Sequence, residues 1–341
     1  MRTYFYLKDK KKIAPCDDSV INKLAKTKLD NIYENRQKLG IPARFINDWS
    51  NVSLYHPSGN IDKANSILLE PEEGAYSLAN RLNHLTGKEW IKFSCSWFIF
   101  NAIASDLKAE KELDPNTEHH PATFSPTMIE SFIKFFTKEG ERVFDPFLGI
   151  GSTTEAASRT GRIGYGTELN PKYYELALKR NPQFVDNIHN IDATKVGTLN
   201  LPEIDFTISS PPYWNILNRS TKDFKKTREN SGFDYNYSDS AIDLGNIDNY
   251  DEFVDAVCNV YLNLYDILRF GAYNVIIVKN VKKGGKMYPL AWDMAIRLGK
   301  KYVLKDEKLW IQDKVALAPY GYPSSWASNI LHHYCIVLRK E

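Results

Sequence analysis

The sequence predicts an α/β fold built around a mostly parallel β-sheet. From Pro126 onward, short apolar runs alternate with segments of helical periodicity, and this order is typical of βαβ units. Two of the runs, residues 142–145 and 205–209, lead directly into turn motifs that contain polar residues. Ligands of parallel sheets bind at the carboxyl ends of the strands, so these two motifs mark the expected site.

The individual elements follow from periodicity and from helix-stop residues. Gly140 and Gly161 are suited to end helices, and Pro171 is suited to begin one. The expected helices cover residues 129–136, 152–160, 171–180, 250–268 and 289–298. The seven expected strands cover residues 142–144, 163–167, 184–188, 205–209, 273–279, 302–310 and 333–338, and the last two are expected to form an antiparallel pair.

Length and composition bound the class of protein. A chain of 341 residues with 43% hydrophobic and 25% charged residues is long enough for one large domain or two smaller ones. It has no apolar run of 18 residues, and its first residues are too polar for a secretory signal. The four cysteines are far apart, so we expect neither a disulfide framework nor a metal site. We therefore expect a cytoplasmic protein without a membrane partner.

The first third of the chain differs from the rest. Residues 1–115 are lysine-rich and are expected to form a mainly helical accessory region, with helices near 19–39 and 74–85. A turn at residues 114–117 is expected to separate this region from a second domain, residues 116–341, which contains the sheet.

The first turn motif indicates a nucleoside cofactor. Asp145 ends a strand, Gly149 and Gly151 allow a tight turn, and a helix begins at Ser152. A dinucleotide-binding fingerprint would have a third glycine where Thr154 stands. An acid at the strand end also suits a cationic ligand better than a pyrophosphate, and the sulfonium and amino groups of S-adenosyl-L-methionine match that charge.

Two further acids stand at the next expected strand ends. Glu168 is placed to accept both ribose hydroxyls of an adenosine, and Asp192 to accept the adenine amino group. Either acid alone is also explained as a helix cap. Acids at three successive strand ends favour a cofactor site.

The second turn motif, Ser210-Pro211-Pro212-Tyr213, suits an exocyclic amine. Two prolines make a stiff corner with free carbonyl acceptors. The Ser210 oxygen and the Pro211 carbonyl are expected to bind the two amine hydrogens, while Tyr213 stacks on the base and Trp214 flanks it. Such an amine belongs to a base outside its duplex, so base flipping is expected. The alternative interpretation is an ordinary Pro-Pro turn.

Taken together, these motifs resemble those of the amino-group DNA methyltransferases that use S-adenosyl-L-methionine. Residues 145–152 are similar to the family's cofactor motif, residues 120–124 to its His-Pro-x-x-Phe segment, and residues 210–213 to its catalytic motif. The resemblance implies a Rossmann-like methyltransferase fold. It implies cofactor contacts from His120, Pro121, Thr123, Phe124, Asp145, Pro146, Phe147, Gly149, Gly151, Ser152, Glu168, Leu169, Asp192 and Ala193.

The motif order departs from that of many family members, because the cofactor motif precedes the catalytic one. The order resembles a circular permutation and leaves three candidates for target recognition: residues 1–115, residues 216–248 and the loop at residues 320–323. Serine before the two prolines usually accompanies cytosine N4 in this family. The resemblance therefore implies N4-cytosine methylation of double-stranded DNA, with a cognate restriction endonuclease as the expected partner and the oligomeric state open. The alternatives are adenine N6 of DNA and guanine N2 of RNA.

Basic and aromatic residues near the two motifs suggest nucleic-acid contacts. A basic cluster follows each of two expected strands, and either cluster is also explained as a solvated loop. A Pro- and Tyr-rich loop precedes the last strand. The expected contact residues are Trp214, Arg219, Lys225, Lys226, Lys282, Lys283, Tyr320 and Tyr322.

Overall fold

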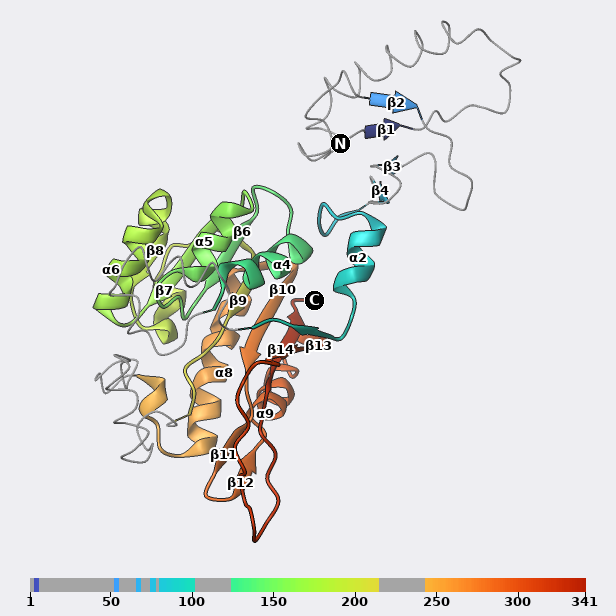
Figure 1. Cartoon of the computed structure of the whole chain (residues 1–341). Coiled ribbons are helices and arrows are strands. Elements are labelled where there is room, and N and C mark those ends of the chain that lie inside the picture. The colour runs from blue at the N-terminus through green and yellow to red at the C-terminus, as the bar shows by residue number, and fades with distance from the viewer. Residues whose placement is uncertain are drawn as a thin grey trace, which may run out of the picture. The chain divides into compact units, whose positions relative to one another are not determined.

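The structure, a computed structural model, describes residues 3–5, 52–54, 66–68, 74–77, 80–101, 124–214 and 243–341. The chain divides into two compact units (Figure 1). The first comprises Met1–Ser94 with Thr137–Glu139, and the second comprises Cys95–Phe136 with Gly140–Glu341. The boundary expected near residue 115 lies outside the described residues and stays a prediction.

The second unit is built on a sheet of eight strands among the described residues. In spatial order they are β5 (Trp97–Ile99), β13 (Val303–Ile311), β14 (His332–Arg339), β10 (Leu268–Val278), β9 (Ile204–Ser209), β6 (Arg142–Asp145), β7 (Ile163–Glu168) and β8 (Ile188–Asn190). The run from β10 to β8 is parallel, and β14 is antiparallel to both of its neighbours. The mostly parallel sheet with an antiparallel pair is therefore confirmed, and β5 adds an edge strand that the sequence did not predict.

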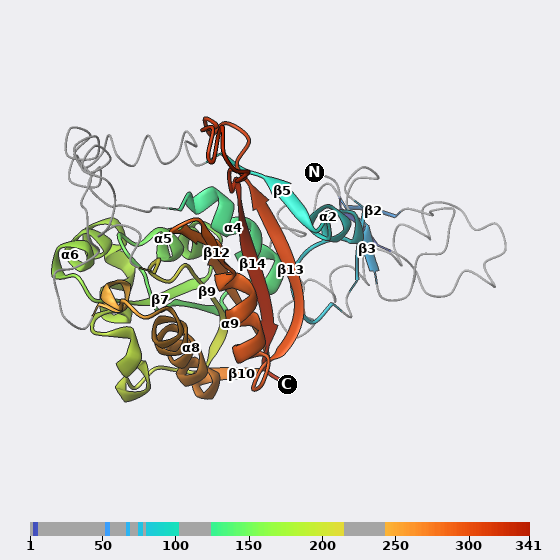
Figure 2. The same ribbon diagram turned by 90° about the horizontal axis from the view of Figure 1, so that it is seen from below.

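Helices cover both faces of this sheet (Figure 2). Helices α4 (Pro126–Phe136) and α5 (Ser152–Arg159) pack together, and so do α8 (Tyr250–Ile267) and α9 (Leu290–Leu298). The pleat of β10 separates the two layers. Ala272 and Ile276 belong to the core cluster under α8 and α9, whereas the ring of Tyr273 lies 4.7 Å from that of Phe136 on α4.

Helix α8 shows how a local pattern supports the site. The Asn249 side chain caps its first turn by accepting from the amide of Glu252 at 3.1 Å. Phe253, Val257 and Tyr261 then recur at helical spacing and are fully buried. Each such side chain contributes roughly 1.5–3 kcal/mol by leaving water. The buried stripe holds the helix against the end of β9, where the Ser210-Pro211-Pro212-Tyr213 segment begins.

Elements of the second unit differ from the sequence prediction at three further places. The expected strand at 184–188 is a 3-10 helix, η5 (Pro182–Asn187), because Pro182 starts a tight turn that buries Phe184, and β8 begins only at Ile188. Strand β10 begins five residues before the expected 273, with a register shift after Leu268. Residues 281–288 form a hairpin, β11 (Val281–Lys283) and β12 (Lys286–Tyr288), because Gly284 and Gly285 both adopt positive φ.

The described part of the first unit holds a small sheet in the order β2 (Val52–Leu54), β1 (Thr3–Phe5), β3 (Ser66–Leu68) and β4 (Ala75–Ser77), followed by helix α2 (Gly87–Phe93). The helix expected at 74–85 is wrong. Residues 75–77 pair with β3, and the Asn80 side chain accepts from the amides of Leu82 and Asn83. Such local side-chain bonds compete with helix formation. The helix expected at 19–39 lies outside the described residues.

Candidate cofactor and catalytic site

Asp145 ends β6 and is buried, with 5% of its surface exposed. Its carboxylate accepts from the Phe147 amide at 2.9 Å and from the Thr153 hydroxyl at 2.6 Å. Burial raises the pKa of Asp145 to about 7, against the opposing effect of these two hydrogen bonds. A desolvated carboxyl group of this kind is stabilised as an anion by a cation. The described residues give it hydrogen bonds from neutral groups, so a cationic ligand fits here.

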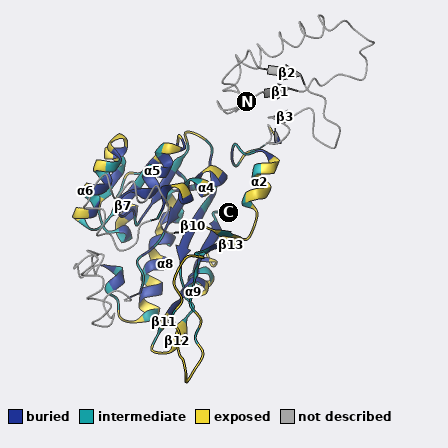
Figure 3. Cartoon of the chain, in the orientation of Figure 1, coloured by how far each residue is buried: buried dark blue, intermediate teal, exposed yellow. Residues whose placement is uncertain are grey.

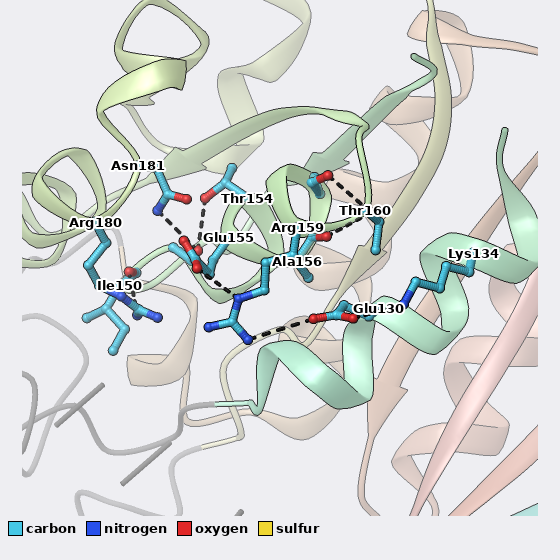
Figure 4. Close-up of polar contacts among 12 residues, drawn as sticks. Glu130, Lys134, Ile150, Thr154, Glu155, Ala156, Arg159, Thr160, Arg180 and Asn181 are labelled. Carbon is cyan, nitrogen blue, oxygen red and sulfur yellow. Dashed lines mark hydrogen bonds and ion pairs between the residues drawn. The ribbon is translucent and has the colours of Figure 1, made fainter. Parts of the chain in front are cut away.

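The turn after Asp145 needs its glycines. Gly149 and Gly151 have φ of 58° and 88°, in the left-handed region. A Cβ on Gly151 would lie 2.4 Å from Nδ2 of Asn181. The end of helix α6 (Pro171–Arg180) holds this turn, because Arg180 donates to the Ile150 carbonyl at 2.8 Å and Asn181 donates to the Gly151 carbonyl at 3.2 Å (Figure 4). The turn is therefore braced on its α6 side before a ligand binds.

Helix α5 continues from the turn and is tied to α4 by charged side chains. Arg159 donates to Glu155 at 2.9 Å and lies 3.7 Å from Glu130, which also pairs with Lys134 (Figure 4). These pairs are partly exposed, so each contributes at most about 1 kcal/mol.

At the other end of the helix, the Ser152 hydroxyl is buried and makes no hydrogen bond within the described residues. An unpaired polar atom beside the glycine turn is the second feature that fits a polar ligand.

Glu168 ends β7 and joins that strand to the glycine turn. Its two carboxylate oxygens accept from the amides of Gly149 and Asn170, each at 2.8 Å. Burial raises the pKa of Glu168 to about 7, while these two bonds act in the opposite direction. Asp192 lies just beyond β8 and caps η6 (Ala193–Thr198) by accepting from the Thr194 amide at 2.9 Å. Asp192 therefore acts as a helix cap through one oxygen of its carboxylate.

The sheet brings these acids together. Asp145 pairs with Gly166, and Glu168 pairs with Asn190, in the parallel registers of β6, β7 and β8. Neighbouring strands are about 4.8 Å apart, so all three acids follow one edge of the sheet. Of the other expected contacts, Ala193 begins η6 and is buried, the Phe147 ring lies 6.1 Å from that of Tyr261, and Pro146 and Leu169 flank the acids.

The Ser210-Pro211-Pro212-Tyr213 corner lies on the other side of β6. Strand β9 is parallel to β6, so its carboxyl end reaches the same edge. Just before the corner, the Ser209 hydroxyl bonds that of Tyr261 at 2.8 Å in the interior. The Ser210 side chain lies close enough to Tyr213 to act toward a lower pKa of its phenol. Burial raises the pKa of Tyr213 to about 12, so its side chain is a neutral phenol.

Trp214 occupies a different place from the one its sequence position suggested. Its side chain is 4% exposed, and its indole nitrogen donates to the Asp248 carbonyl at 3.1 Å. Its ring packs against those of Tyr250 and Tyr288, with centroids 5.0 and 4.7 Å away, and these two rings also contact each other at 4.9 Å. This burial differs from the flanking position that we expected for Trp214: in this structure it packs inside the protein next to the Ser210-Pro211-Pro212-Tyr213 corner and presents no open face to a base.

A further set of side chains lies at the same edge, beyond β9. The ring of His333 stacks on that of Trp310 at 4.3 Å, and burial lowers the pKa of His333 to about 3, so it is neutral. The Trp310 ring also lies 5.7 Å from Phe124, the described member of the His-Pro-x-x-Phe segment. Lys279 directly follows β10 and is partly buried, which lowers its pKa. The sequence signal for Lys279 was its position at the end of an expected strand, the same signal that identified Asp145.

The remaining predicted contact residues divide into two groups. Lys282 and Lys283 lie on the β11–β12 hairpin, and Tyr320 and Tyr322 are exposed on the loop before β14. His120, Pro121, Thr123, Arg219, Lys225 and Lys226 lie outside the described residues and stay predictions.

Comparison with protein families agrees with this geometry. The model of the N6/N4 methyltransferase family, described as DNA methylase, matches residues 4–179, half of the chain. The chain belongs to this DNA methylase family. The matched residues include the glycine turn and both Asp145 and Glu168. The resemblance inferred from the motifs is therefore confirmed at the level of the family.

Individual relatives match over shorter stretches. The chain is 36% identical over 73 residues to the orphan methyltransferase M.BamHII of Bacillus amyloliquefaciens, covering 21% of this chain and 28% of that one. It is 29% identical over 120 residues to the type II methyltransferase M.BglI of Bacillus subtilis, covering 35% and 31%. The chain thus spans under a third of the length of these relatives. Among solved structures, TrmN of Thermus thermophilus is similar at 15% identity and a TM-score of 0.41, covering 65% of this chain and 50% of that one.

Proposed function

We propose that this protein transfers a methyl group from S-adenosyl-L-methionine to the exocyclic N4 of cytosine in DNA. The observation that carries the proposal is the position of the Ser210 corner. It lies at the carboxyl end of β9, immediately beside β6, which ends in the buried Asp145. A cationic methyl donor held at one strand end is thereby adjacent to an amine held at the next.

The cofactor end uses the three acids and the glycine turn. Asp145 faces the cationic methionine part, Glu168 takes the ribose hydroxyls and Asp192 the adenine amine. The cofactor supplies an electrophilic methyl group. The chain supplies its placement, because the turn is braced by Arg180 and Asn181 and the buried acids favour a cation over water.

At the corner, catalysis rests on orientation of the amine. A serine hydroxyl donates one hydrogen bond and accepts two, so Ser210 can donate to Tyr213 and still accept from the amine. The Pro211 carbonyl accepts the second amine hydrogen. The nitrogen lone pair is then directed at the methyl group, with no covalent intermediate between protein and base. As the new carbon–nitrogen bond forms, the bond from the methyl carbon to the donor sulfur would break, S-adenosyl-L-homocysteine would leave, and one of the two amine protons would pass to water. The base must leave its duplex to reach this corner.

Genomic DNA from a strain that lacks this gene provides a substrate whose recognition sequence need not be known. Incubation with tritiated S-adenosyl-L-methionine, digestion to nucleosides and chromatography should give label in N4-methylcytosine. Label in N6-methyladenine would overturn the base assignment and leave the reaction class intact. Label only in tRNA, offered in parallel, would overturn DNA as the substrate.

Ser210→Ala tests the corner itself. We expect it to lower kcat by about 10²–10³, the range for loss of one pre-organised polar group. Its affinity for S-adenosyl-L-methionine should stay at the wild-type level, because the cofactor end is on the neighbouring strands. A kcat within twofold of wild type would remove Ser210 from the mechanism.

The partners follow from the same proposal. M.BglI, which is 29% identical to this chain over 120 residues, is by name a type II methyltransferase. We therefore place this protein in a restriction–modification system, acting on double-stranded DNA beside a cognate endonuclease. Sequencing of host DNA for modified bases, with and without the gene, should reveal one methylated sequence motif that disappears with the gene.

A further inference from the structure

Two segments extend from the sheet edge that carries the corner (Figures 1 and 3). The basic hairpin is β11–β12, residues 281–288, and it begins just after β10 ends at Val278. The aromatic loop is residues 312–331, which connects the end of β13 to the start of β14. Strand β10 is parallel to β9, and β13 pairs with β14 beside it, so both segments leave the sheet at the carboxyl edge of β9.

The aromatic loop exposes large rings to an unusual extent. Tyr320, Tyr322 and Trp326 are 60%, 81% and 87% exposed. Clustered exposed aromatic residues in a protein surface mark a contact with a partner. Figure 3 shows the exposed colouring continuing along this loop and onto the hairpin.

The loop is also braced, so its rings are presented by a formed structure. The Asn329 side chain donates to the Ala318 carbonyl and accepts from the Ala318 amide, both at 2.9 Å. Gly321, at φ +82°, accepts from the Ser324 amide at 2.9 Å, and a Cβ there would lie 2.4 Å from the Ser325 carbonyl oxygen. Pre-organisation of this kind lowers the entropy cost of binding.

Side-chain contacts connect the loop to the catalytic corner. The Lys282 ammonium donates to the Ser328 carbonyl and, at 3.0 Å, to the Ser328 hydroxyl. The ammonium of the next residue, Lys283, lies 3.9 Å from the centroid of the Trp214 ring. Trp214 directly follows Tyr213, so two successive contacts join the loop to the hairpin and the hairpin to the corner. The two lysines thus have structural partners in addition to the phosphates that the sequence suggested.

The charge of these segments selects a polyanion. Together they contain four lysines (282, 283, 286 and 314) and one acid, Asp313. Aromatic rings interleaved with lysines are typical of surfaces on which bases stack while cations follow the phosphates. A partner protein with an apolar surface would not need the lysines, and a free anion would not need the rings.

We propose that the aromatic loop stacks on DNA bases next to the target base, with Trp326 as the main stacking residue, and that the basic hairpin holds the loop in register with Ser210. This inference rests on the proposed function and identifies the element that engages the substrate. Stacking contributes about 1–3 kcal/mol per base, and 1.4 kcal/mol corresponds to tenfold in affinity.

The test compares Trp326→Ala with Phe270→Ala. Phe270 is 74% exposed and lies near the start of β10, at the opposite edge of the sheet, so it is a matched control. Binding of a fluorescent mixed-sequence duplex is measured by anisotropy with S-adenosyl-L-homocysteine present. We expect Trp326→Ala to bind about tenfold more weakly and Phe270→Ala to bind like wild type. Both should keep wild-type affinity for S-adenosyl-L-homocysteine.

Salt dependence distinguishes stacking from charge. The slope of log K against log salt reports the phosphates that are neutralised. Trp326→Ala should keep the wild-type slope, whereas Lys286→Gln should reduce it by about 1. Wild-type DNA affinity in Trp326→Ala, or an altered slope, overturns the inference while the wild type still methylates DNA. Failure of the proposed function itself would appear separately, as a wild-type protein that transfers no methyl group to DNA.

Discussion

The two halves of the sheet present opposite kinds of side chain at one edge. In the half proposed to bind the cofactor, β6 to β8 (the cofactor half), the acids are desolvated; Asp145 accepts from one backbone amide and Glu168 from two. In the half proposed to bind the substrate, β10 to β14 (the substrate half), lysines and large aromatic rings extend outward on a hairpin and a loop. The proposed ligands would account for the difference: a small cofactor of fixed shape rewards a rigid, buried site, whereas a polymer must be bound on an exposed surface.

The largest expected effect comes from filling the glycine turn of the cofactor half. Gly151→Ala places a Cβ 2.4 Å from Asn181 and keeps φ in the left-handed region. We expect calorimetry to show about a hundredfold lower affinity for S-adenosyl-L-methionine, because the displaced turn would no longer fit the ligand. A hundredfold loss corresponds to about 2.7 kcal/mol of binding free energy.

Gly140 provides the control for this substitution. Its φ is +81°, close to that of Gly151, but no atom lies within 4 Å of its Cβ position. Gly140→Ala should therefore cost only the backbone term, about 1–2 kcal/mol in the free energy of unfolding, with cofactor affinity unchanged. Equal cofactor affinities in the two variants would contradict a rigid turn. The double variant Gly151→Ala with Asn181→Ala should recover part of the lost cofactor affinity, because the smaller side chain makes room for the new Cβ.

An intermediate effect is expected from pH. The pKa of Asp145 and that of Glu168 are each raised to about 7 by burial. A cationic ligand binds the ionised carboxylate, so affinity for S-adenosyl-L-methionine should rise as pH passes upward through 7. One such group gives a change of about fivefold to tenfold between pH 6 and pH 7.5.

Asp145→Asn keeps the size and shape of the side chain but removes the titrating group. It should bind more weakly and show a smaller pH dependence, leaving that of Glu168. A flat wild-type profile, or one that Asp145→Asn reproduces in full, would show that the buried acid does not face the cation.

The smallest effect is expected in the substrate half, where single contacts are exposed. Lys282→Met keeps the length of the side chain and removes its hydrogen bonds to Ser328. Loss of one exposed charged contact costs about 0.5–1 kcal/mol, so kcat/KM on genomic DNA should fall about threefold. Lys300→Met is the control, because Lys300 is exposed just beyond the end of α9 and belongs to neither the hairpin nor the loop, so kcat/KM should stay at the wild-type level. An equal fall in the two variants would contradict the proposed connection.

The sequence predicted the elements whose ends are marked by local chemistry. Helix α6 has the predicted bounds because Asn170 caps it and Pro171 fits its first turn. The helix expected at 74–85 is absent because the side chains of Asn80 and Asn83 accept from nearby backbone amides and compete with helical hydrogen bonds there. Strand β5 and the early start of β10 depend on pairing with distant strands, and periodicity in a short window does not contain that information.

The site divides in the same way. Asp145 and Glu168 were identifiable because a strand end followed by glycine or asparagine is a local signal. The interior position of Trp214 was not, because it is set by Tyr250 and Tyr288, which lie 36 and 74 residues further along the chain. Lys279 and His333 likewise acquire their surroundings only when β10 and β14 are paired.

The hydrogen bond from the Gly149 amide to Glu168 has a consequence for turnover. It joins the glycine turn to the next strand before any nucleoside arrives, so binding needs no ordering of that backbone. Under the proposed function, the spent cofactor meets the same formed turn but has lost its positive charge together with the methyl group, so Asp145 no longer attracts it. Loss of that charge, and not reopening of the turn, would then drive release of the demethylated product.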